Sequence, residues 1–484
     1  MSNFTSIDQM IKSQYSTTPE RPHLTYKLDG VWQTKTYKES ITDVFALAET
    51  LTQKGYSNKH FLIYAENSYE WIISDLAIIG YVGVSVAVDS FWQYDDVKNA
   101  INFTDVSVVL YSEKNIDVIK KLQADFSNVD FLSLSIDVPN FIDKGHDLLA
   151  VKPDVFDLEP RATDTMCKIL FTSGTNGLPK AAILTQNNIL SIKSGLDYSL
   201  HLKKEDIVFL FLPLRHVLAS VDIEIYMMGL GMEVVICSNK NKLFEEMQET
   251  NPTILVSVPL IYEKLYAAKQ VNVFGNRMKI LVTGGALATP EVVRYFNESG
   301  ISLVQGYGLT ETSGAISVQH IDEIEEYKSV GNPFSYLSAK IINANSKGTG
   351  EIVLKGDCIF MGYYKNSTAT KSAFTEDGYF KTGDLGYFDA GNRLCVTGRK
   401  KRIILTNNGE NVYPDEIENM LNNVDIVEAS KVFQDGNLIA AEIHTIGGGY
   451  SEEVNAIISN YNKKTPKYKQ ISRHRVLDIA AKMK

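Results

Sequence analysis

The sequence has few cysteines, and none of them are closely spaced. Its 484 residues contain only four, Cys167, Cys237, Cys358 and Cys395, and no two form a C-x-x-C pair. This spacing argues against the disulfide frameworks of small secreted proteins and against zinc sites built from paired cysteines. Three of the four lie in apolar runs, so we interpret the cysteines as small buried hydrophobic side chains in a reducing compartment.

Long hydrophobic runs and targeting signals are also missing. The longest apolar runs, such as residues 207–214, have the length of a strand and are too short to span a bilayer. The amino terminus (MSNFTS) has neither the basic nor the apolar region of a secretory signal. These absences predict a cytoplasmic protein without a transmembrane segment.

Positive charge is in deficit. The chain has 48 Lys and Arg residues against 58 Asp and Glu residues, a formal net charge of -10. That balance argues against nucleic acid as the main partner. The content of 44% hydrophobic and 22% charged residues is ordinary for a globular protein, and the length exceeds what one hydrophobic core supports, so we expect two or more domains. No internal repeat or low-complexity segment is evident.

The middle of the chain alternates short strands with helices. Runs of β-branched residues predict strands at residues 168–171, 207–212, 233–237, 254–258, 279–283 and 302–305. Between the last two, Thr289 is the predicted N-cap of a helix, Pro290 fits its first position, and Gly300 ends it. This order predicts an α/β fold with largely parallel sheets, which bind ligands beyond the carboxyl ends of their strands.

Near residue 340 the alternation of predicted strands and helices gives way to a different sequence pattern. Short strands with Gly-rich turns over about residues 340–398 predict a small β subdomain within a large N-terminal domain, residues 1–398. The basic cluster at residues 399–402 then precedes a compact stretch, residues 403–484. We place a domain boundary at that cluster.

One polar loop is a candidate phosphate site. Residues Thr172 to Lys180 (TSGTNGLPK) combine three hydroxyls, two glycines and a lysine. Backbone N–H groups and hydroxyls donate to phosphate oxygens, and an ammonium neutralises their charge. Asn176-Gly177 by itself indicates a hairpin turn. A Walker loop needs glycine before its lysine, where this chain has Pro179, and no G-x-G-x-x-G follows a strand.

As a whole the loop resembles the phosphate loop of the adenylate-forming superfamily, which includes acyl-CoA synthetases, luciferase-like ligases and peptide-synthetase adenylation domains. Segments similar to that family follow in its order at residues 284–286 (GGA), 305–313 (QGYGLTETS), 380–386 (FKTGDLG) and 398–418. Taken singly they are also typical of turns, a helix start or a solvated basic face. Together they favour the resemblance, which is strongest to acyl-CoA synthetases and long-chain fatty acid–CoA ligases.

The resemblance implies binding of ATP and Mg²⁺. It assigns the ATP phosphates to Thr172, Ser173, Gly174, Thr175, Gly177 and Lys180. The backbone at Gly285 and Ala286 would lie against the adenine, on which Tyr307 would stack. Thr310 would bond the α-phosphate, and Glu311 would bind the Mg²⁺ ion as a hard oxygen ligand.

The remaining motifs are implied to hold the ribose and to join two domains. Asp384 would accept hydrogen bonds from both ribose hydroxyls, and Arg399 would reach the ribose. Lys401 lies where the family pivots, so residues 399–402 would be a hinge to a small, mobile α+β C-terminal domain. In the family that domain rotates between adenylation and transfer of the acyl group to a thiol of coenzyme A or of a carrier-protein phosphopantetheine.

The acid is indicated by one further segment. Residues 212–217 (LPLRHV) resemble the place where acyl- and aryl-CoA ligases put a histidine beside the acyl pocket, although His216 is equally typical of a strand end. Amino-acid-activating members commonly have an aspartate where this chain has Leu218, and a buried ammonium without a counter-charge is costly. We therefore expect a fatty or other apolar acid, while Asp222 nearby leaves an amino acid open.

Departures from the family pattern leave three hypotheses. Ala181 and Asn176 replace a usual glycine and threonine, with small expected effects. The family's lysine near its end lies in a Gly-Lys context, and the last residues here (IAAKMK) have no such pair, so we name no catalytic lysine there. The first hypothesis is an AMP-forming acyl-CoA synthetase. The second is a standalone adenylation protein that loads an acyl carrier protein, and the third is a non-catalytic nucleotide-binding relic or truncated form. No oligomeric state is predicted.

Overall fold

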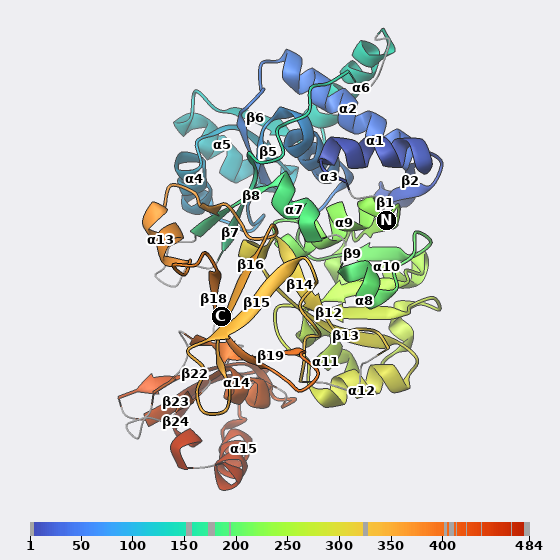
Figure 1. The fold of residues 1–484 in the computed structure, drawn as a ribbon. Coiled ribbons are helices and arrows are strands. Elements are labelled where there is room, and N and C mark those ends of the chain that lie inside the picture. The colour runs from blue at the N-terminus through green and yellow to red at the C-terminus, as the bar shows by residue number, and fades with distance from the viewer. Residues whose placement is uncertain are drawn as a thin grey trace.

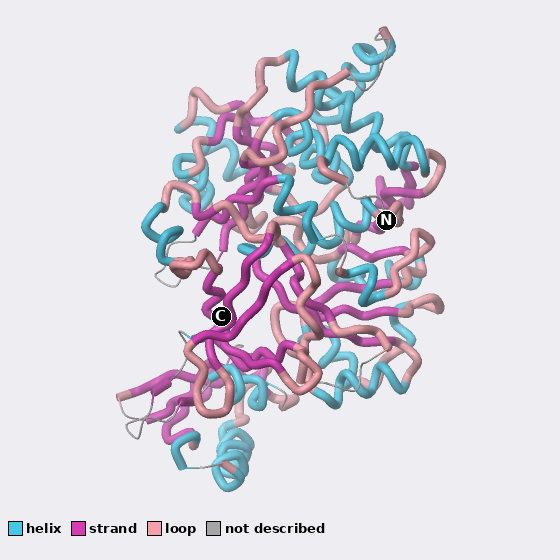
Figure 2. The backbone as a smooth tube through the Cα atoms, viewed as in Figure 1, coloured by secondary structure: helices cyan, strands magenta, loops and turns pink. Residues whose placement is uncertain are grey.

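Helices and strands alternate through most of the chain and build the predicted α/β architecture (Figure 1). The computed structural model describes residues 4–151, 157–172, 180–192, 195–322, 328–400, 404–405, 411–412, 414–422, 424–436, 438–465 and 467–478. Figure 2 shows the strands gathered into sheets with helices along their faces. No helix in the described part of the chain is both long and apolar enough to cross a bilayer.

The first sheet has seven strands in the order β17-β8-β7-β4-β3-β5-β6. They are β3 (His60–Tyr64), β4 (Val84–Ala87), β5 (Val106–Tyr111), β6 (Asp130–Ser133), β7 (Met166–Thr172), β8 (Lys180–Thr185) and β17 (Gly362–Tyr363). Strands β3 to β7 pair in parallel, whereas β8 and β17 are antiparallel additions at one edge. In β5 (VSVVLY) nearly every residue is buried, which is typical of a parallel strand covered on both faces.

The second sheet has eight strands in the order β14-β13-β12-β11-β9-β10-β1-β2. They are β1 (Pro22–Leu28), β2 (Val31–Thr36), β9 (Ile207–Leu210), β10 (Glu233–Ile236), β11 (Ile254–Ser257), β12 (Ile280–Thr283), β13 (Ser302–Leu309) and β14 (Gly314–Val318). The predicted strands are present, but β9 ends two residues early and β13 extends to Leu309. Strand β13 continues past its glycines because β14 packs against it, where a Cβ on Gly308 would lie 2.2 Å from the Gly314 oxygen.

Helices cover both sheets. They are α1 (Ile7–Thr17), α2 (Tyr37–Gln53), α3 (Tyr69–Ala77), α4 (Tyr94–Phe103), α5 (Ile116–Asp125), α6 (Asp137–Ala150), α7 (Gln186–Ser191), α8 (Leu196–Leu200), α9 (Tyr226–Gly229), α10 (Leu243–Thr250), α11 (Pro259–Ala267) and α12 (Pro290–Glu298). The predicted helix is α12, which begins at Pro290 after Thr289. Thr289 is its N-cap, as predicted, although the Thr289 side chain makes no capping hydrogen bond.

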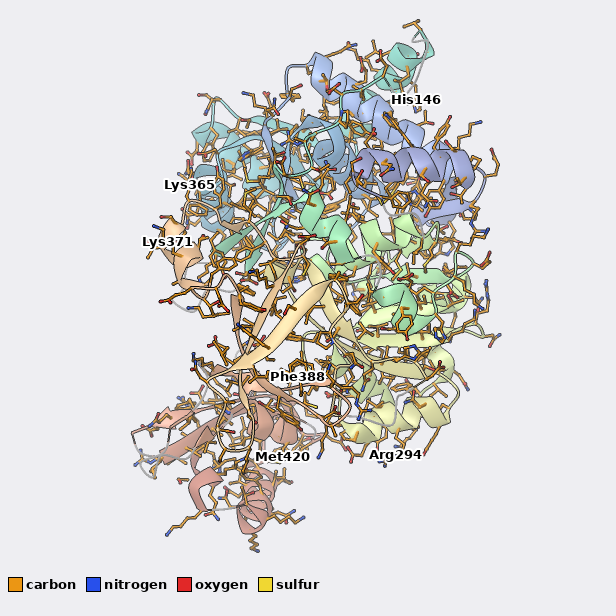
Figure 3. All side chains as sticks on the ribbon, viewed as in Figure 1. His146, Arg294, Lys365, Lys371, Phe388 and Met420 are labelled. Carbon is orange, nitrogen blue, oxygen red and sulfur yellow. The ribbon has the colours of Figure 1, made fainter. Side chains whose placement is uncertain are left out.

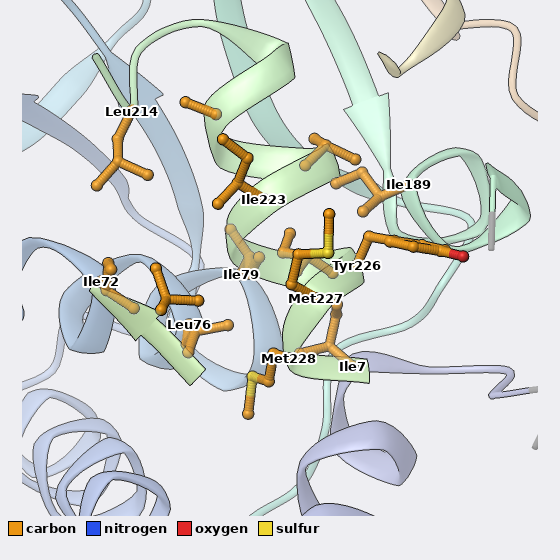
Figure 4. Close-up of a cluster of buried hydrophobic side chains, with 14 of the residues drawn as sticks. Ile7, Ile72, Leu76, Ile79, Ile189, Leu214, Ile223, Tyr226, Met227 and Met228 are labelled. Atoms are coloured by element: carbon orange, nitrogen blue, oxygen red, sulfur yellow. The ribbon is translucent and has the colours of Figure 1, made fainter. Parts of the chain in front are cut away.

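Two π-helical segments lie where the sheets meet. They are η1 (Ile78–Val82), which continues α3, and η4 (Leu218–Ile225), which leads into α9. Figure 4 shows Ile72, Leu76 and Ile79 of α3 and η1 beside Ile223 of η4 and Met227 of α9. All five belong to one hydrophobic cluster, so helices of the first and second sheets share a core.

Three smaller sheets, of four, two and three strands in chain order, follow in the described part of the chain. The first is antiparallel, with strands β15 (Leu337–Ile342), β16 (Gly350–Gly356), β18 (Phe380–Phe388) and β19 (Leu394–Arg399). Between β16 and β18 the chain leaves this sheet, pairs β17 with β8 and forms α13 (Ser367–Ser372). The region predicted as one β subdomain therefore contributes a strand to the first large sheet.

The last residues form a compact α+β unit at the lower end of Figure 1. It contains β20 (Ile404–Leu405), β21 (Asn411–Val412), α14 (Pro414–Asn422), β22 (Val427–Asp435), β23 (Leu438–Thr445), α15 (Ser451–Lys464) and β24 (Ile471–Asp478). Its core is a separate hydrophobic cluster that includes Ile417, Leu421 and Ile443. In Figure 3, Phe388 of β18 belongs to the four-stranded sheet, and Met420 of α14 lies below it in the C-terminal α+β unit.

Candidate active site

Two predicted motifs lie at the carboxyl ends of neighbouring parallel strands. Strands β12 and β13 pair with Thr283 opposite Gln305, so the turn of residues 284–286 leaves the sheet beside Tyr307. Gly285 has φ +83°, in the left-handed region that favours glycine, and a Cβ there would meet no atom within 4 Å. The glycine is thus explained by the backbone conformation, and both it and Ala286 are exposed.

Tyr307, Asp384 and Arg399 form one polar group. The Tyr307 hydroxyl donates to Asp384 Oδ2 at 2.7 Å, and Asp384 Oδ1 lies 3.0 Å from Nε of Arg399. Arg399 faces Asp384 because the two are register partners on β19 and β18. Burial, and then the charge of Asp384, raise the pKa of Tyr307 well above its ordinary value, so the tyrosine stays a hydrogen-bond donor. Only 3% of the Asp384 surface is exposed.

A second group joins the lysine of the candidate phosphate loop to Glu311. Glu311 lies in the short 3₁₀ turn Thr310–Thr312 that follows β13, and its Oε1 accepts a hydrogen bond from the Tyr363 hydroxyl at 2.8 Å. The Nζ of Lys180 lies 4.3 Å from the centre of the Tyr363 ring, within cation–π range. Strand β17 brings Tyr363 here by pairing with β8. Nothing in the sequence pattern marked Tyr363, since its place depends on that distant pairing.

The candidate phosphate loop connects two antiparallel strands. Thr172 at the end of β7 is the register partner of Lys180 at the start of β8, and its hydroxyl donates to the Lys180 carbonyl at 3.4 Å. The loop therefore leaves and re-enters the sheet at one point beside Tyr363. The other predicted phosphate ligands, the predicted pivot and the chain end lie outside the described residues: Ser173, Gly174, Thr175, Gly177, Lys401 and Lys484.

His216 lies in the turn between β9 and η4 and takes part in neither polar group. Its carbonyl accepts hydrogen bonds from the N–H groups of Ala219 and Ser220, both at 3.0 Å. The residue is exposed, yet desolvation of its ring and the charge of Arg215 lower its pKa to about 4, so the imidazole is neutral at pH 7. Arg215 lies 2.7 Å from Asp89, which anchors this turn to the loop after β4 in the first sheet.

Asp222 on η4 is buried and turned toward β14. Its carboxyl oxygens accept from the Ala315 N–H at 3.2 and 3.3 Å. Burial raises its pKa to about 8, against the opposing effect of that hydrogen bond. Asp222 therefore carries a proton at pH 7. Gly314 makes room for it, since a Cβ there would lie 2.5 Å from Oδ1.

Asp222→Asn should flatten the dependence of stability on pH. The folded pKa of about 8 lies above the ordinary value of 3.8, so stability from the protonated carboxyl is complete below pH 4 and is lost as the pH rises toward 8. The wild type should lose about 1.4 kcal/mol more per pH unit than the variant between pH 5 and 7. Urea unfolding at several pH values measures this slope. Parallel pH profiles would contradict the assignment, and Asp29→Asn, on an exposed turn, is the matched control.

A buried ionic cluster lies beneath the site. Lys168 Nζ on β7 is 2.7 Å from Asp75 Oδ2 on α3, and both side chains are fully buried. Glu224 on η4 has 2% of its surface exposed, and burial and the Asp75 charge raise its pKa well above the ordinary value. Neither Glu224 oxygen has a hydrogen-bond partner in the described part of the chain. The cluster links the strand that leads into the phosphate loop with the helix that follows His216, and the lysine within the apolar run CKILF was its only sequence signal.

Comparisons with known proteins identify the family of the chain. A family model described as AMP-binding enzyme matches residues 11–364. The chain is 28% identical over 482 residues to long-chain-fatty-acid–CoA ligase FadD15 of Mycobacterium bovis, covering 87% of this chain and 78% of that protein. It is 28% identical over 485 residues to long chain acyl-CoA synthetase 1 of Arabidopsis thaliana, covering 84% and 73%.

Solved structures share the fold. ATP-bound MatB from Rhodopseudomonas palustris superimposes with a TM-score of 0.84 at 21% identity, covering 98% of this chain and 94% of that one. O-succinylbenzoate coenzyme A synthetase from Bacillus subtilis, in complex with ATP and magnesium ion, gives a TM-score of 0.81 at 22% identity, covering 97% and 95%. Both comparisons extend through the C-terminal α+β unit.

Proposed function

Because the chain belongs to the AMP-binding enzyme family, we propose that it is an AMP-forming acid–thiol ligase that makes acyl-CoA through an acyl-AMP intermediate. A carboxylate is a poor electrophile, since its charge repels nucleophiles and oxide is a poor leaving group. Attack of the carboxylate on the α-phosphate of ATP releases pyrophosphate and gives a mixed anhydride. A thiol then attacks the acyl carbon and AMP leaves. The protein aligns these groups and offsets the developing charge.

The observation that carries this proposal is the pairing of Asp384 with Tyr307 and Arg399. A buried carboxylate held between a phenol and a guanidinium, at the carboxyl end of β13, suits a nucleoside. Asp384 accepts the ribose hydroxyls, Arg399 reaches the ribose, and Tyr307 with the turn at Gly285 and Ala286 contacts the adenine.

The second polar group serves the phosphates. Lys180 and Thr172, with the loop between them, neutralise and bond the pyrophosphate end, while Thr310 bonds the α-phosphate. The carboxylate of Glu311 is a hard oxygen donor that fits Mg²⁺. When bound, Mg²⁺ would neutralise phosphate charge and polarise the reacting phosphoryl group. The Tyr363 hydroxyl fixes the Glu311 side chain, and its ring orients the Lys180 ammonium.

The C-terminal unit serves the second half-reaction in this proposal. Strand β19 ends at Arg399, and the α+β unit described from Ile404 onward has a hydrophobic core of its own. Residues 1–398 then act as the nucleotide domain, residues 399–402 as a hinge and residues 403–484 as a mobile domain. CoA is the proposed thiol, as the names of the relatives suggest.

A fatty or other apolar acid is the proposed substrate. Leu218 stands where amino-acid-activating relatives of the superfamily are expected to have an aspartate. It lies beside the glycine turn, since a Cβ added to Gly284 would be 3.4 Å from the Leu218 Cδ2. Asp222, the other candidate partner for an ammonium, is protonated at pH 7 and bonded to Ala315. His216, whose imidazole is neutral and exposed, lies just before η4, the helical segment that carries Leu218 and Asp222. These features leave no counter-charge for an amino group in this segment.

AMP release in the presence of a panel of carboxylic acids tests the function. We expect AMP formation that requires ATP, Mg²⁺, an apolar acid and CoA together, with fatty acids preferred over amino acids by about 100-fold or more in kcat/KM. Acid-dependent exchange of pyrophosphate into ATP isolates the first step. Acylation of a carrier protein but not of CoA would instead favour the standalone adenylation protein. Absence of exchange across all the acids would contradict an enzymatic role.

A further inference from the structure

A separate cluster of side chains lies at the other end of β14 from Glu311. His201 is the C-cap residue that follows α8, and His320 and Asp322 follow β14. The two histidine rings meet edge to face, with centroids 5.1 Å apart. Asp322 Oδ2 lies 3.7 Å from Nε2 of His201 and 3.7 Å from Nδ1 of His320. One nitrogen or oxygen atom from each residue lies within 4.8 Å of the other two.

The backbone brings these residues together before any ion binds. The Ile321 N–H donates to the Ser199 carbonyl at 2.9 Å, which joins the segment after β14 to α8. The Gln319 N–H donates to the Gln305 carbonyl at 2.9 Å and holds the same segment to β13. His201 has φ +50°, a left-handed conformation that few residues other than glycine adopt, at the point where α8 ends.

We propose that His201, His320 and Asp322 bind a divalent transition-metal ion such as Zn²⁺. Two imidazoles and one carboxylate are a common ligand set for such ions, and three protein ligands leave a coordination position for water or a small ligand. Bonds of about 2.0–2.1 Å in a tetrahedral site place ligand atoms about 3.3 Å apart. The 3.7 Å separations from Asp322 therefore need small side-chain adjustments, and the two imidazole nitrogens, within 4.8 Å of each other, must approach by up to about 1.5 Å. The side chains of His201 and Asp322 are 51% and 67% exposed, which lets an ion enter without opening the fold.

The site is chemically and spatially distinct from the proposed Mg²⁺ ligand. Glu311 offers only hard oxygen atoms, whereas the cluster offers two imidazoles. The five residues of β14 lie between them, a span of about 17 Å. His320 also lines a cavity of about 380 Å³, together with Tyr198, Phe334 and Arg393. A bound ion would therefore tie α8 to the segment after β14 at the edge of this cavity.

Metal titration of the untagged full chain, without nucleotide, tests the proposal. We expect one equivalent of Zn²⁺ to bind with a dissociation constant in the low micromolar range, roughly 1–10 μM. His201→Ala and His320→Ala should each weaken binding by about 10-fold or more. Affinity should rise from Co²⁺ to Ni²⁺ to Cu²⁺, and millimolar Mg²⁺ should not displace the bound ion.

A matched control separates this site from ordinary surface histidines. His146 on α6, at the top of Figure 3, pairs with Asp43 at 2.7 Å but has no second histidine beside it in the described part of the chain. His146→Ala should bind Zn²⁺ like the wild type. No binding by the wild type at about 100 μM Zn²⁺ would overturn the proposal, as would equal affinity in all three variants. Because the readout is binding alone, it is independent of the proposed ligase activity.

Discussion

Replacing Asp384 by alanine should lower kcat/KM for ATP by roughly two to four orders of magnitude, because each hydrogen bond to a charged group contributes about 1.5–3 kcal/mol and two are lost. The same change removes the acceptor of the Tyr307 hydroxyl and the ion-pair partner of Arg399, so the groups around the nucleoside also lose their fixed positions. Asp384→Asn keeps one acceptor oxygen and should retain more activity. Pyrophosphate exchange at saturating acid and varied ATP measures both variants.

Asp389 provides the control in the same hairpin. It pairs with Arg393, whose Nε lies 2.8 Å from Asp389 Oδ2, and it closes the turn between β18 and β19. Asp389→Ala therefore removes a comparable acid–arginine pair away from Tyr307, and its kcat/KM for ATP should stay within about twofold of the wild type. Unchanged kinetics in Asp384→Ala would sink the ribose assignment. Urea unfolding of both variants separates a loss of stability from a loss of binding.

Replacing Lys168 by methionine should destabilise the fold by about 3–5 kcal/mol, because it leaves the Asp75 carboxylate buried without a partner. Both side chains are fully buried, with Nζ and Oδ2 2.7 Å apart. The buried neighbour Glu224 is also acidic, so it cannot replace the positive charge of Lys168. Methionine preserves most of the lysine's length, so packing against Trp71 changes little. The midpoint of urea unfolding, or the yield of folded protein, reports the effect.

A double variant makes this prediction decisive even if the single variant does not fold. Lys168→Met combined with Asp75→Leu removes both charges, and it should recover much of the lost stability. Lys98→Met is the surface counterpart, since Lys98 lies 2.7 Å from Asp125 and the two side chains are 38% and 34% exposed, and it should unfold like the wild type. If Lys168→Met also unfolded like the wild type, the buried pair would have no structural role.

Sequence reasoning worked best where chemistry restricts residue types. Tyr307, Asp384 and Arg399 were each selected from separate motifs, and the structure places them in direct contact. Parallel strands explain why the turn at Gly285 meets the tyrosine motif, since the carboxyl ends of such strands share one edge of a sheet. The roles of these residues toward ATP remain predictions.

The features that were missed depend on contacts between distant parts of the chain. Tyr363 contributes through the short strand β17, and two residues of strand have no periodicity to detect. Strand β13 was ended too early because glycines usually interrupt strands, whereas here they allow close approach of β14. Glu224 lies on a π-helical segment, whose hydrogen-bond pattern differs from the spacing assumed for α-helices.

The second sheet combines two strands from near the start of the chain, β1 and β2, with strands that begin only after residue 206. Strand β1 pairs in parallel with β10, and the residues of the whole first sheet except β17 lie between them. During synthesis, β1 and β2 would leave the ribosome roughly 10–40 s before β10, at about 5–20 residues per second. Until then the hairpin has no parallel neighbour, and its edge is open to pairing with other chains. Newly made chains should thus depend on chaperones over that interval, and fragments that end before residue 233 should aggregate even with most of the first sheet complete.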